Sequence, residues 1–168
     1  VGSNARAPAR AAALANGAAG HALDYDDTHF AYLGHPSTVV MPTVLALAER
    51  IGATASELYD AALIGLEGAT RVGIWLGRGH YQIGFHITAS AGSFGSTMAA
   101  SRLLCLTEEQ TTHAISLVAS RAAGLKSQFG TMGKPYHAGM SASNGIEAAL
   151  LAKAGFISRS SALDGEQG

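Results

Sequence analysis

Residues 54–76 have the sequence TASELYDAALIGLEGATRVGIWL, and this stretch decides the fold class. Thr54 followed by Glu57 is a capping-box pattern, in which two side chains satisfy free backbone N–H groups at the start of a helix. The residues that follow are rich in alanine and leucine, which favour helix, and the alternation typical of a strand is scarce. The stretch therefore predicts a helix that runs to about Leu76.

Similar signals recur along the rest of the chain. Thr107 and Gln110 form a second capping box, and Pro8 is a good first-turn residue. Gly52 and Gly155 are placed as helix-ending glycines. We expect helices at about 8–17, 37–50, 54–76, 87–104, 107–123 and 137–154, with loops at 77–80 and 124–135. The sequence thus predicts an all-α helical bundle that occupies residues 1–168 as a single domain.

Two of these helices have faces made of small residues. The first set is Gly92, Ser93, Gly95 and Ser96, and the second is Gly139, Ser141, Ala142, Ser143 and Gly145. A glycine inside a helix costs up to about 1 kcal/mol relative to alanine, so another interaction must offset it. We interpret these faces as sites of tight helix packing.

The composition excludes several classes of protein. Of the 168 residues, 48% are hydrophobic and only 14% are charged, which indicates surface destined for another domain or subunit. The formal net charge is −1 and no basic run is present, so nucleic acid is not an expected partner. The longest apolar stretch, residues 39–48, is interrupted by Pro42 and is too short to span a bilayer.

The single cysteine, Cys105, excludes an internal disulfide framework and a protein-held iron–sulfur cluster. We expect Cys105 to be a small core residue. A reducing compartment fits this count, and no signal-peptide pattern is present, so we expect a cytoplasmic protein without a membrane partner. The chain starts at Val1 and stops in a loop-like 163–168 segment, so we expect a fragment.

The segment Gly20-His-Ala-Leu-Asp-Tyr-Asp-Asp-Thr28 holds three carboxylates and a histidine, and His35 follows seven residues later. Carboxylates and imidazoles brought this close can transfer protons, although the segment could instead be a solvated helix end in which Asp27 or Thr28 caps the next turn. His35 precedes Pro36, which favours an extended backbone in a loop at the start of a helix. A helix N-terminus there favours anions.

Two further segments carry candidate residues. His86 lies just before a glycine-rich helix, where it could be a helix-start residue or an active-site imidazole. Lys134 is either a solvated loop cation or a partner for a carboxylate, with His137 one helical turn later. His21, His29, His80 and His113 lack a zinc-ligand pattern, so no metal is expected.

Four segments, in the same order along the chain, resemble the MmgE/PrpD family, which includes 2-methylcitrate dehydratase, cis-aconitate decarboxylase and iminodisuccinate epimerase. They are residues 20–28, Gly84-Phe-His-Ile-Thr88, Gly133-Lys-Pro-Tyr-His-Ala-Gly139 and Asn144-Gly-Ile-Glu-Ala-Ala149. The resemblance implies the large helical domain of that fold, a homodimer and an enzyme without metal or other cofactor. It also implies that a second, α+β domain, absent from this chain, completes the active site. Its implied site residues are Asp24, His35, His86 and Lys134 as catalytic groups, with Thr28 and His137 binding substrate.

The resemblance implies a lyase that dehydrates a small polycarboxylate similar to 2-methylcitrate. Such a reaction needs a base, an acid for the leaving hydroxyl, and cations to offset charge on a carboxylate. Asp24, His35 and His86 can share the proton transfers, and Lys134 can neutralise charge. The alternatives are epimerisation of an iminodicarboxylate, decarboxylation of cis-aconitate and, in a different class, an inactive helical assembly module.

Overall fold

A computed structural model describes residues 4–166, and within this range all regular structure is helical, as predicted. The expectation of a fragment rests on Val1, which lies outside the described residues, and on the loop-like segment 163–168, of which residues 163–166 are described and form turns. The helices are α1 (Ala9–Gly20), α2 (Ser37–Ile51), α3 (Ala55–Gln82), α4 (Ile87–Leu103), α5 (Glu108–Ala119), the short 3₁₀ helix η1 (Lys126–Gln128) and α6 (Gly133–Lys153).

Both predicted capping boxes are present. The Thr54 side chain accepts a hydrogen bond from the backbone N–H of Glu57, whose carboxylate accepts one from the backbone N–H of Thr54. Thr107 and Gln110 make the same reciprocal pair at the start of α5. These contacts fix where α3 and α5 begin, because they satisfy donors that the first turn leaves free.

The prediction of a loop at residues 77–80 is wrong. Gly77 has φ +67° and breaks the regular geometry of α3, but the helix resumes and continues to Gln82. Glycine adopts positive φ without the steric penalty that other residues incur, so the kink falls at this residue. The result is a bent helix rather than a helix followed by a loop.

The predicted loop at 124–135 is also too long, because α6 begins at Gly133 instead of His137. Lys134 and Pro135 therefore lie in the first helical turn. Backbone N–H groups in that turn have no partner within the helix, so proline is tolerated there. The helix predicted at 107–123 is too long, because α5 ends at Ala119 rather than Ala123.

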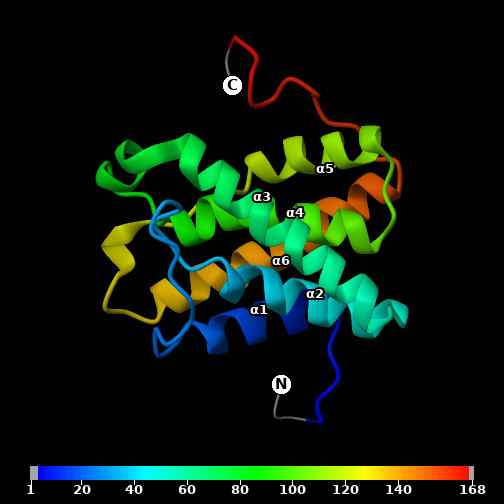
Figure 1. Cartoon of the computed structure of the whole chain (residues 1–168), viewed down its shortest axis with the longest axis horizontal. Helices are drawn as coiled ribbons and strands as arrows, with labels where there is room; N and C mark the ends of the chain where they lie inside the picture. Colours follow the sequence, from blue (N-terminus) through cyan, green and yellow to red (C-terminus); the bar gives the residue numbers. More distant parts are fainter. Residues whose placement is uncertain (1–3, 167–168) are drawn as a thin grey trace.

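Two helices form the centre of the bundle. Figure 1 shows α4 and α6 side by side, and each of them contacts α2 and α5. α3 packs on α4 from one side, and α1 packs on α6 from the other. No helix among residues 4–166 is both long enough and apolar enough to cross a membrane.

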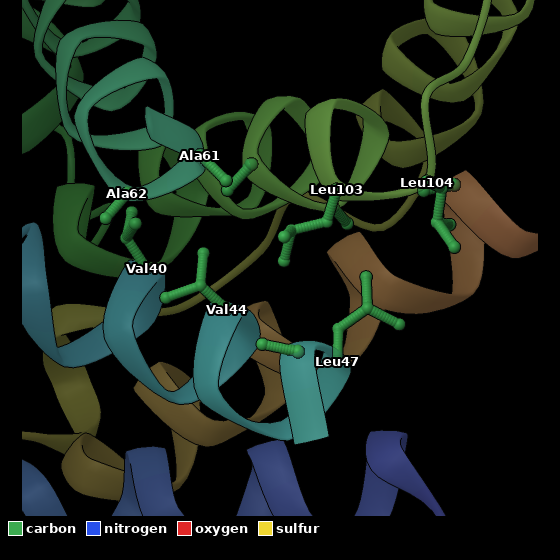
Figure 2. Close-up of a cluster of buried hydrophobic side chains, with 11 residues drawn as sticks. Val40, Val44, Leu47, Ala61, Ala62, Leu103 and Leu104 are labelled. Atoms are coloured by element: carbon green, nitrogen blue, oxygen red, sulfur yellow. The ribbon is translucent and has the colours of Figure 1, made fainter. Parts of the chain in front are cut away.

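The largest buried cluster joins α2 to its neighbours. In Figure 2, Val40, Val44 and Leu47 of α2 point toward the alanines of α3 and the end of α4. Their partners are Ala61, Ala62, Leu103 and Leu104. Small side chains on α3 let α2 approach closely. Truncating a buried leucine such as Leu47 to alanine typically costs 2–5 kcal/mol, so this cluster is a main source of stability.

The small-residue faces pack inside the chain. A Cβ added to Gly139 would lie 2.2 Å from the backbone oxygen of Leu14 on α1, and one added to Gly145 would lie 2.1 Å from Oγ of Ser96 on α4. Tight helix packing, the interpretation of these residues from the sequence, is therefore confirmed.

Cys105 does not occupy the core position that we expected. It is exposed, and its φ of +51° places it in the turn that follows α4. The turn reverses the chain between α4 and α5, so the cysteine points to solvent while its neighbours Leu103 and Leu104 are buried.

We expect Gly139→Ala to destabilise the fold and Gly79→Ala to leave it intact. The methyl group at Gly139 would force α1 away from α6, at a cost of about 1–3 kcal/mol. Gly79 also lies in a helix, but a Cβ there meets no atom within 4 Å, and alanine should add up to about 1 kcal/mol of stability. Urea unfolding midpoints of the two variants test this contrast, and equal midpoints would contradict it.

Candidate active site

The candidate site lies where α1 ends and where α2, α4 and α6 begin. His21 follows the last residue of α1, and His35 stands two residues before the start of α2. His86 is the N-cap residue of α4, and Lys134 is in the first turn of α6. Three helix N-termini therefore meet here, and their partial positive charge favours an anionic ligand.

Asp24 and Lys134 form an ion pair across the site. The Lys134 ammonium donates a hydrogen bond to Oδ2 of Asp24, and it also lies 5.3 Å from the centre of the Phe129 ring. This hydrogen bond lowers the pKa of Asp24, so the carboxylate stays ionised at neutral pH. Asp24 has φ +58°, an uncommon conformation for any residue but glycine, and such conformations concentrate at functional sites.

Asp26 lies between two imidazole rings. Its Oδ2 is 2.8 Å from Nδ1 of His21 and 3.4 Å from Nδ1 of His35. The two ring centres are 4.8 Å apart. On the other side, Oδ1 of Asp24 lies 3.6 Å from Nδ1 of His21 and 3.8 Å from Nε2 of His35. Two carboxylates and two imidazoles therefore form one connected group.

His86 extends this group into the interior. Its ring stacks on that of His21 with centres 5.7 Å apart, and its Nδ1 lies 3.2 Å from Nδ1 of His137. The edge of Phe129 closes another side. The backbone N–H of His86 donates to the carbonyl of Gly124, which ties the start of α4 to the segment before η1.

The buried histidines are neutral at physiological pH. Burial lowers the pKa of His86 to about 3, and the neighbouring His21 and His137 act in the same direction. Burial also lowers the pKa of His21 and that of His137, although Asp26 opposes the shift at His21. A neutral imidazole carries one N–H donor and one lone pair, so these rings can pass a proton or donate a hydrogen bond without a permanent charge.

The structure brings together five of the six residues that the sequence nominated. Asp24, His35, His86 and Lys134 belong to the connected group, and His137 joins it through His86. Thr28 does not join it: the residue is exposed, and its side chain makes no hydrogen bond within residues 4–166. The roles of all six residues in binding or catalysis stay predictions.

Asp27 takes the structural role that the sequence offered as an alternative. Its Oδ1 accepts hydrogen bonds from the backbone N–H and the hydroxyl of Ser37, at the first turn of α2. The N-terminus of α2 therefore already faces a carboxylate. Only α4 and α6 begin without a side-chain cap at this site.

Sequence reasoning did not nominate His21 and Asp26 as site residues, although both side chains are largely enclosed. The His21 side chain is fully buried, and that of Asp26 is only 8% exposed. The sequence places both in the carboxylate-rich segment 20–28 but assigns neither of them a role in the site. Their spacing of five residues was the available signal, but it marks a contact only if the loop after α1 folds back on itself.

A cleft of about 470 Å³ opens beside the group. It is lined on one side by residues 21–24 and on the other by Gly130, Thr131, Met132, Lys134 and Pro135. The carboxylate of Asp24 and the ammonium of Lys134 thus meet at an opening large enough for a small metabolite. A larger hollow of about 770 Å³ lies near residues 4–9 and Glu49 and has no comparable set of side chains.

Four of these residues could be considered as metal ligands. Donor atoms of His21, Asp24, Asp26 and His35 all lie within 4.8 Å of one another. Lys134, however, already compensates Asp24, and Asp26 is at hydrogen-bond distance from His21. A divalent ion would have to displace these contacts next to an ammonium group, so the residues fit a hydrogen-bonded ion-pair network better than a metal site.

Comparison with known proteins gives the family. The family model of the MmgE/PrpD N-terminal domain matches residues 1–168, and the chain therefore belongs to the MmgE/PrpD family. It is 34% identical to human cis-aconitate decarboxylase over 168 residues, which is 97% of this chain and 35% of that enzyme. It is 32% identical to the cis-aconitate decarboxylase of Aspergillus terreus over 165 residues, or 94% of this chain and 34% of the relative. The chain thus spans about a third of the length of the curated relatives it matches.

We expect the fold to lose stability when the pH falls below about 6.5, partly because of His86. The unfolded histidine binds a proton near pH 6.5, whereas the folded one does so only near pH 3. Between these values the unfolded state holds more protons, so His86 alone lowers the unfolding free energy by about 1.4 kcal/mol per pH unit. Urea unfolding at pH 7, 6 and 5 should show a shallower pH dependence for His86→Asn than for the unmodified chain. Identical slopes would contradict the burial argument.

Proposed function

We propose that this chain supplies one side of the active site of a lyase that acts on a small polycarboxylate. The observation that carries the proposal is the Asp24–Lys134 ion pair at an open cleft, backed by the His35, His21 and His86 rings. The ammonium group and the free N-termini of α4 and α6 favour carboxylate groups of a substrate. The adjoining imidazoles offer proton acceptors and donors within reach of each other.

The site contains one group suited to neutralise charge, Lys134, and histidines suited to transfer protons. Lys134 would neutralise a substrate carboxylate when charge grows on it during removal of the neighbouring carbon-bound proton. His35 is suited to accept that proton. His86, whose pKa of about 3 keeps it neutral, is suited to donate a hydrogen bond from its ring. In dehydration the electron pair of the broken C–H bond forms the double bond, and the hydroxyl leaves with a proton as water.

Decarboxylation of cis-aconitate is a second candidate, and the relatives favour it, because those that match this chain bear that name. In that reaction a C–C bond breaks, CO₂ leaves, and the electron pair left on the substrate takes up a proton. The same cation and imidazoles serve both reactions. The difference is whether the proton donor faces a hydroxyl or a carbon atom. We retain 2-methylcitrate-type dehydration as the first candidate from the sequence, with a second domain completing the site.

We expect the full-length protein to turn over 2-methylcitrate or cis-aconitate, and residues 1–168 alone to be silent. A screen of citrate, 2-methylcitrate, cis-aconitate and iminodisuccinate, with and without EDTA, identifies the reaction, and chelation should not abolish it. His35→Ala or His86→Ala should lower kcat by about 10²–10⁴-fold, because each removes a proton-transfer group.

His113→Ala on α5 is the matched control and should keep near-normal kcat. Near-normal kcat in both site variants would refute the assigned chemistry. A full-length protein that processes none of the four substrates would favour the inactive assembly module.

We also propose that the protein forms a homodimer in the cytoplasm, with the outer face of α3 in the contact. The small-residue faces are used within the chain, so they do not supply this surface. Instead, α3 exposes Tyr59, Leu63, Ile64, Ile74 and Trp75. Leu63, Ile64 and Gly68 also form an apolar groove with Met98 of α4. Exposed apolar surface of this kind marks interaction sites.

Sedimentation at micromolar concentration tests the dimer. The unmodified protein should sediment as a species of two chains, and Leu63→Arg combined with Trp75→Arg should shift it to a single chain. Glu49→Arg on α2 introduces the same side chain on another helix and should leave the dimer intact. A single-chain species for the unmodified full-length protein would exclude the dimer.

A further inference from the structure

We propose that Asp26, braced by His21, is a positioning residue that holds the His35 imidazole with its proton on Nδ1. Nε2 of His35 is then the lone-pair nitrogen available to a substrate proton. The proposal deepens the proposed function and rests on it, because it concerns the proton acceptor of that reaction. It gives a role to Asp26 and His21, to which the proposed reaction assigns no chemical step.

The geometry places a single carboxylate oxygen against two imidazoles. Oδ2 of Asp26 lies 2.8 Å from Nδ1 of His21 and 3.4 Å from Nδ1 of His35. The first distance is a hydrogen bond, whereas the second is a close contact beyond hydrogen-bond range, and Nδ1 of His35 has no hydrogen-bond partner among the described residues. Catalytic hydrogen bonds are often loose without a substrate and tighten when it binds.

Hydrogen-bond chemistry then fixes the proton positions. An ionised carboxylate can only accept, so any nitrogen bonded to it must carry the hydrogen. The hydrogen bond to Asp26 therefore places the proton of the neutral His21 ring on Nδ1 and leaves the lone pair on Nε2, and the proposal assigns the same tautomer to His35, whose Nδ1 faces the same oxygen. Nε2 of His21 has no hydrogen-bond partner among the described residues, so nothing there favours the opposite tautomer.

His21 explains why Asp26 can hold its place. The His21 ring is fully buried between the Asp26 carboxylate and the stacked His86 ring. Its short hydrogen bond anchors Oδ2, and the same oxygen then meets His35. A carboxylate that orients a histidine through Nδ1 is the arrangement that hydrolases use to keep the reactive nitrogen unprotonated.

Asp24 is less suited to this task. Its hydrogen bond goes to Lys134, its side chain is half exposed, and its contact with His35 is 3.8 Å from Nε2, the nitrogen that must stay free. The two carboxylates therefore have separate roles. Asp24 pairs with the cation that faces substrate, and Asp26 sets the tautomer of the base.

Histidine-selective ¹⁵N NMR of the full chain tests the proposal directly. In the unmodified protein at pH 7.5, His21 and His35 should both show a protonated Nδ1 and an unprotonated Nε2. Asp26→Asn places an amide that can donate as well as accept, so the Nδ1–H preference should be lost in both rings. Asp27→Asn is the matched control: the same change one residue away, at a side chain whose capping role an amide can fill, should leave both tautomers unchanged.

Kinetics of the full-length enzyme supply the second readout. Asp26→Asn should lower kcat by at least about tenfold with little change in KM, because the base is mispositioned while the substrate contacts remain. Asp26→Glu, which keeps a carboxylate, should recover part of the loss. Asp27→Asn should keep near-normal kcat.

The outcomes separate this proposal from the proposed function. An Nε2–H tautomer of His35 in the unmodified protein overturns the positioning role even if the enzyme is active, and that measurement needs no variant to fold. Unchanged tautomers and kcat in Asp26→Asn overturn it as well. Tautomers as expected in a full-length protein that processes no polycarboxylate would instead overturn the lyase assignment and leave the Asp26–His35 geometry standing.

Discussion

The close approach of α1 to α6 is the constraint on which the candidate site depends. A Cβ on Gly17 would lie 2.9 Å from Cα of Gly139, so the two backbones touch and no larger residue fits between them. This contact sets the end of α1 directly beside the start of α6. His21 and Asp24 then lie next to Lys134, although the aspartate and the lysine are 110 residues apart in the chain.

The charged and the neutral groups of the site differ in how far they are buried. The exposed half of the site carries the ionised pair of Asp24 and Lys134, where solvent limits the cost of the charges. The interior half carries His21, His86 and His137, which burial keeps neutral. Asp26 is the exception, because its carboxylate is nearly enclosed and accepts a hydrogen bond from Nδ1 of the neutral His21 ring. Burying a carboxylate raises the free energy of the folded state unless the carboxylate is hydrogen-bonded. The burial of Asp26 therefore supports a specific role for this residue.

Local signals in the sequence predicted the fold well, and they failed where the backbone departs from regular geometry. The capping boxes at Thr54 and Thr107 placed two helix starts, because they depend only on residues three positions apart. The break at Gly77 was anticipated but misread as a loop, because glycine content does not reveal whether a helix resumes. Pro135 suggested a loop for the same reason. Composition alone also placed Cys105 in the core, whereas the turn after α4 directs it to solvent.

The sequence predicted only those site residues that occupy positions in the family motifs. Asp24, His35, His86 and Lys134 were nominated by motif, and the structure joins them. His21 and Asp26 were not, because their importance arises from a loop that returns on itself and from burial against α4, which no spacing rule expresses. The exposed Thr28 shows the converse, since its side chain makes no hydrogen bond within residues 4–166 although it holds a motif position.

The same burial that makes the site chemically useful makes the fold sensitive to acid. Keeping His86 neutral removes a charge that would repel the neighbouring imidazoles and Lys134, and this allows its ring to pack against those of His21 and His137. In the unfolded chain the His86 imidazole is not buried, so it binds a proton at a higher pH than it does in the folded chain. The fold must therefore offset this penalty with apolar burial and close helix packing elsewhere. The glycine contacts of α1 with α6 and of α4 with α6 are part of that close packing.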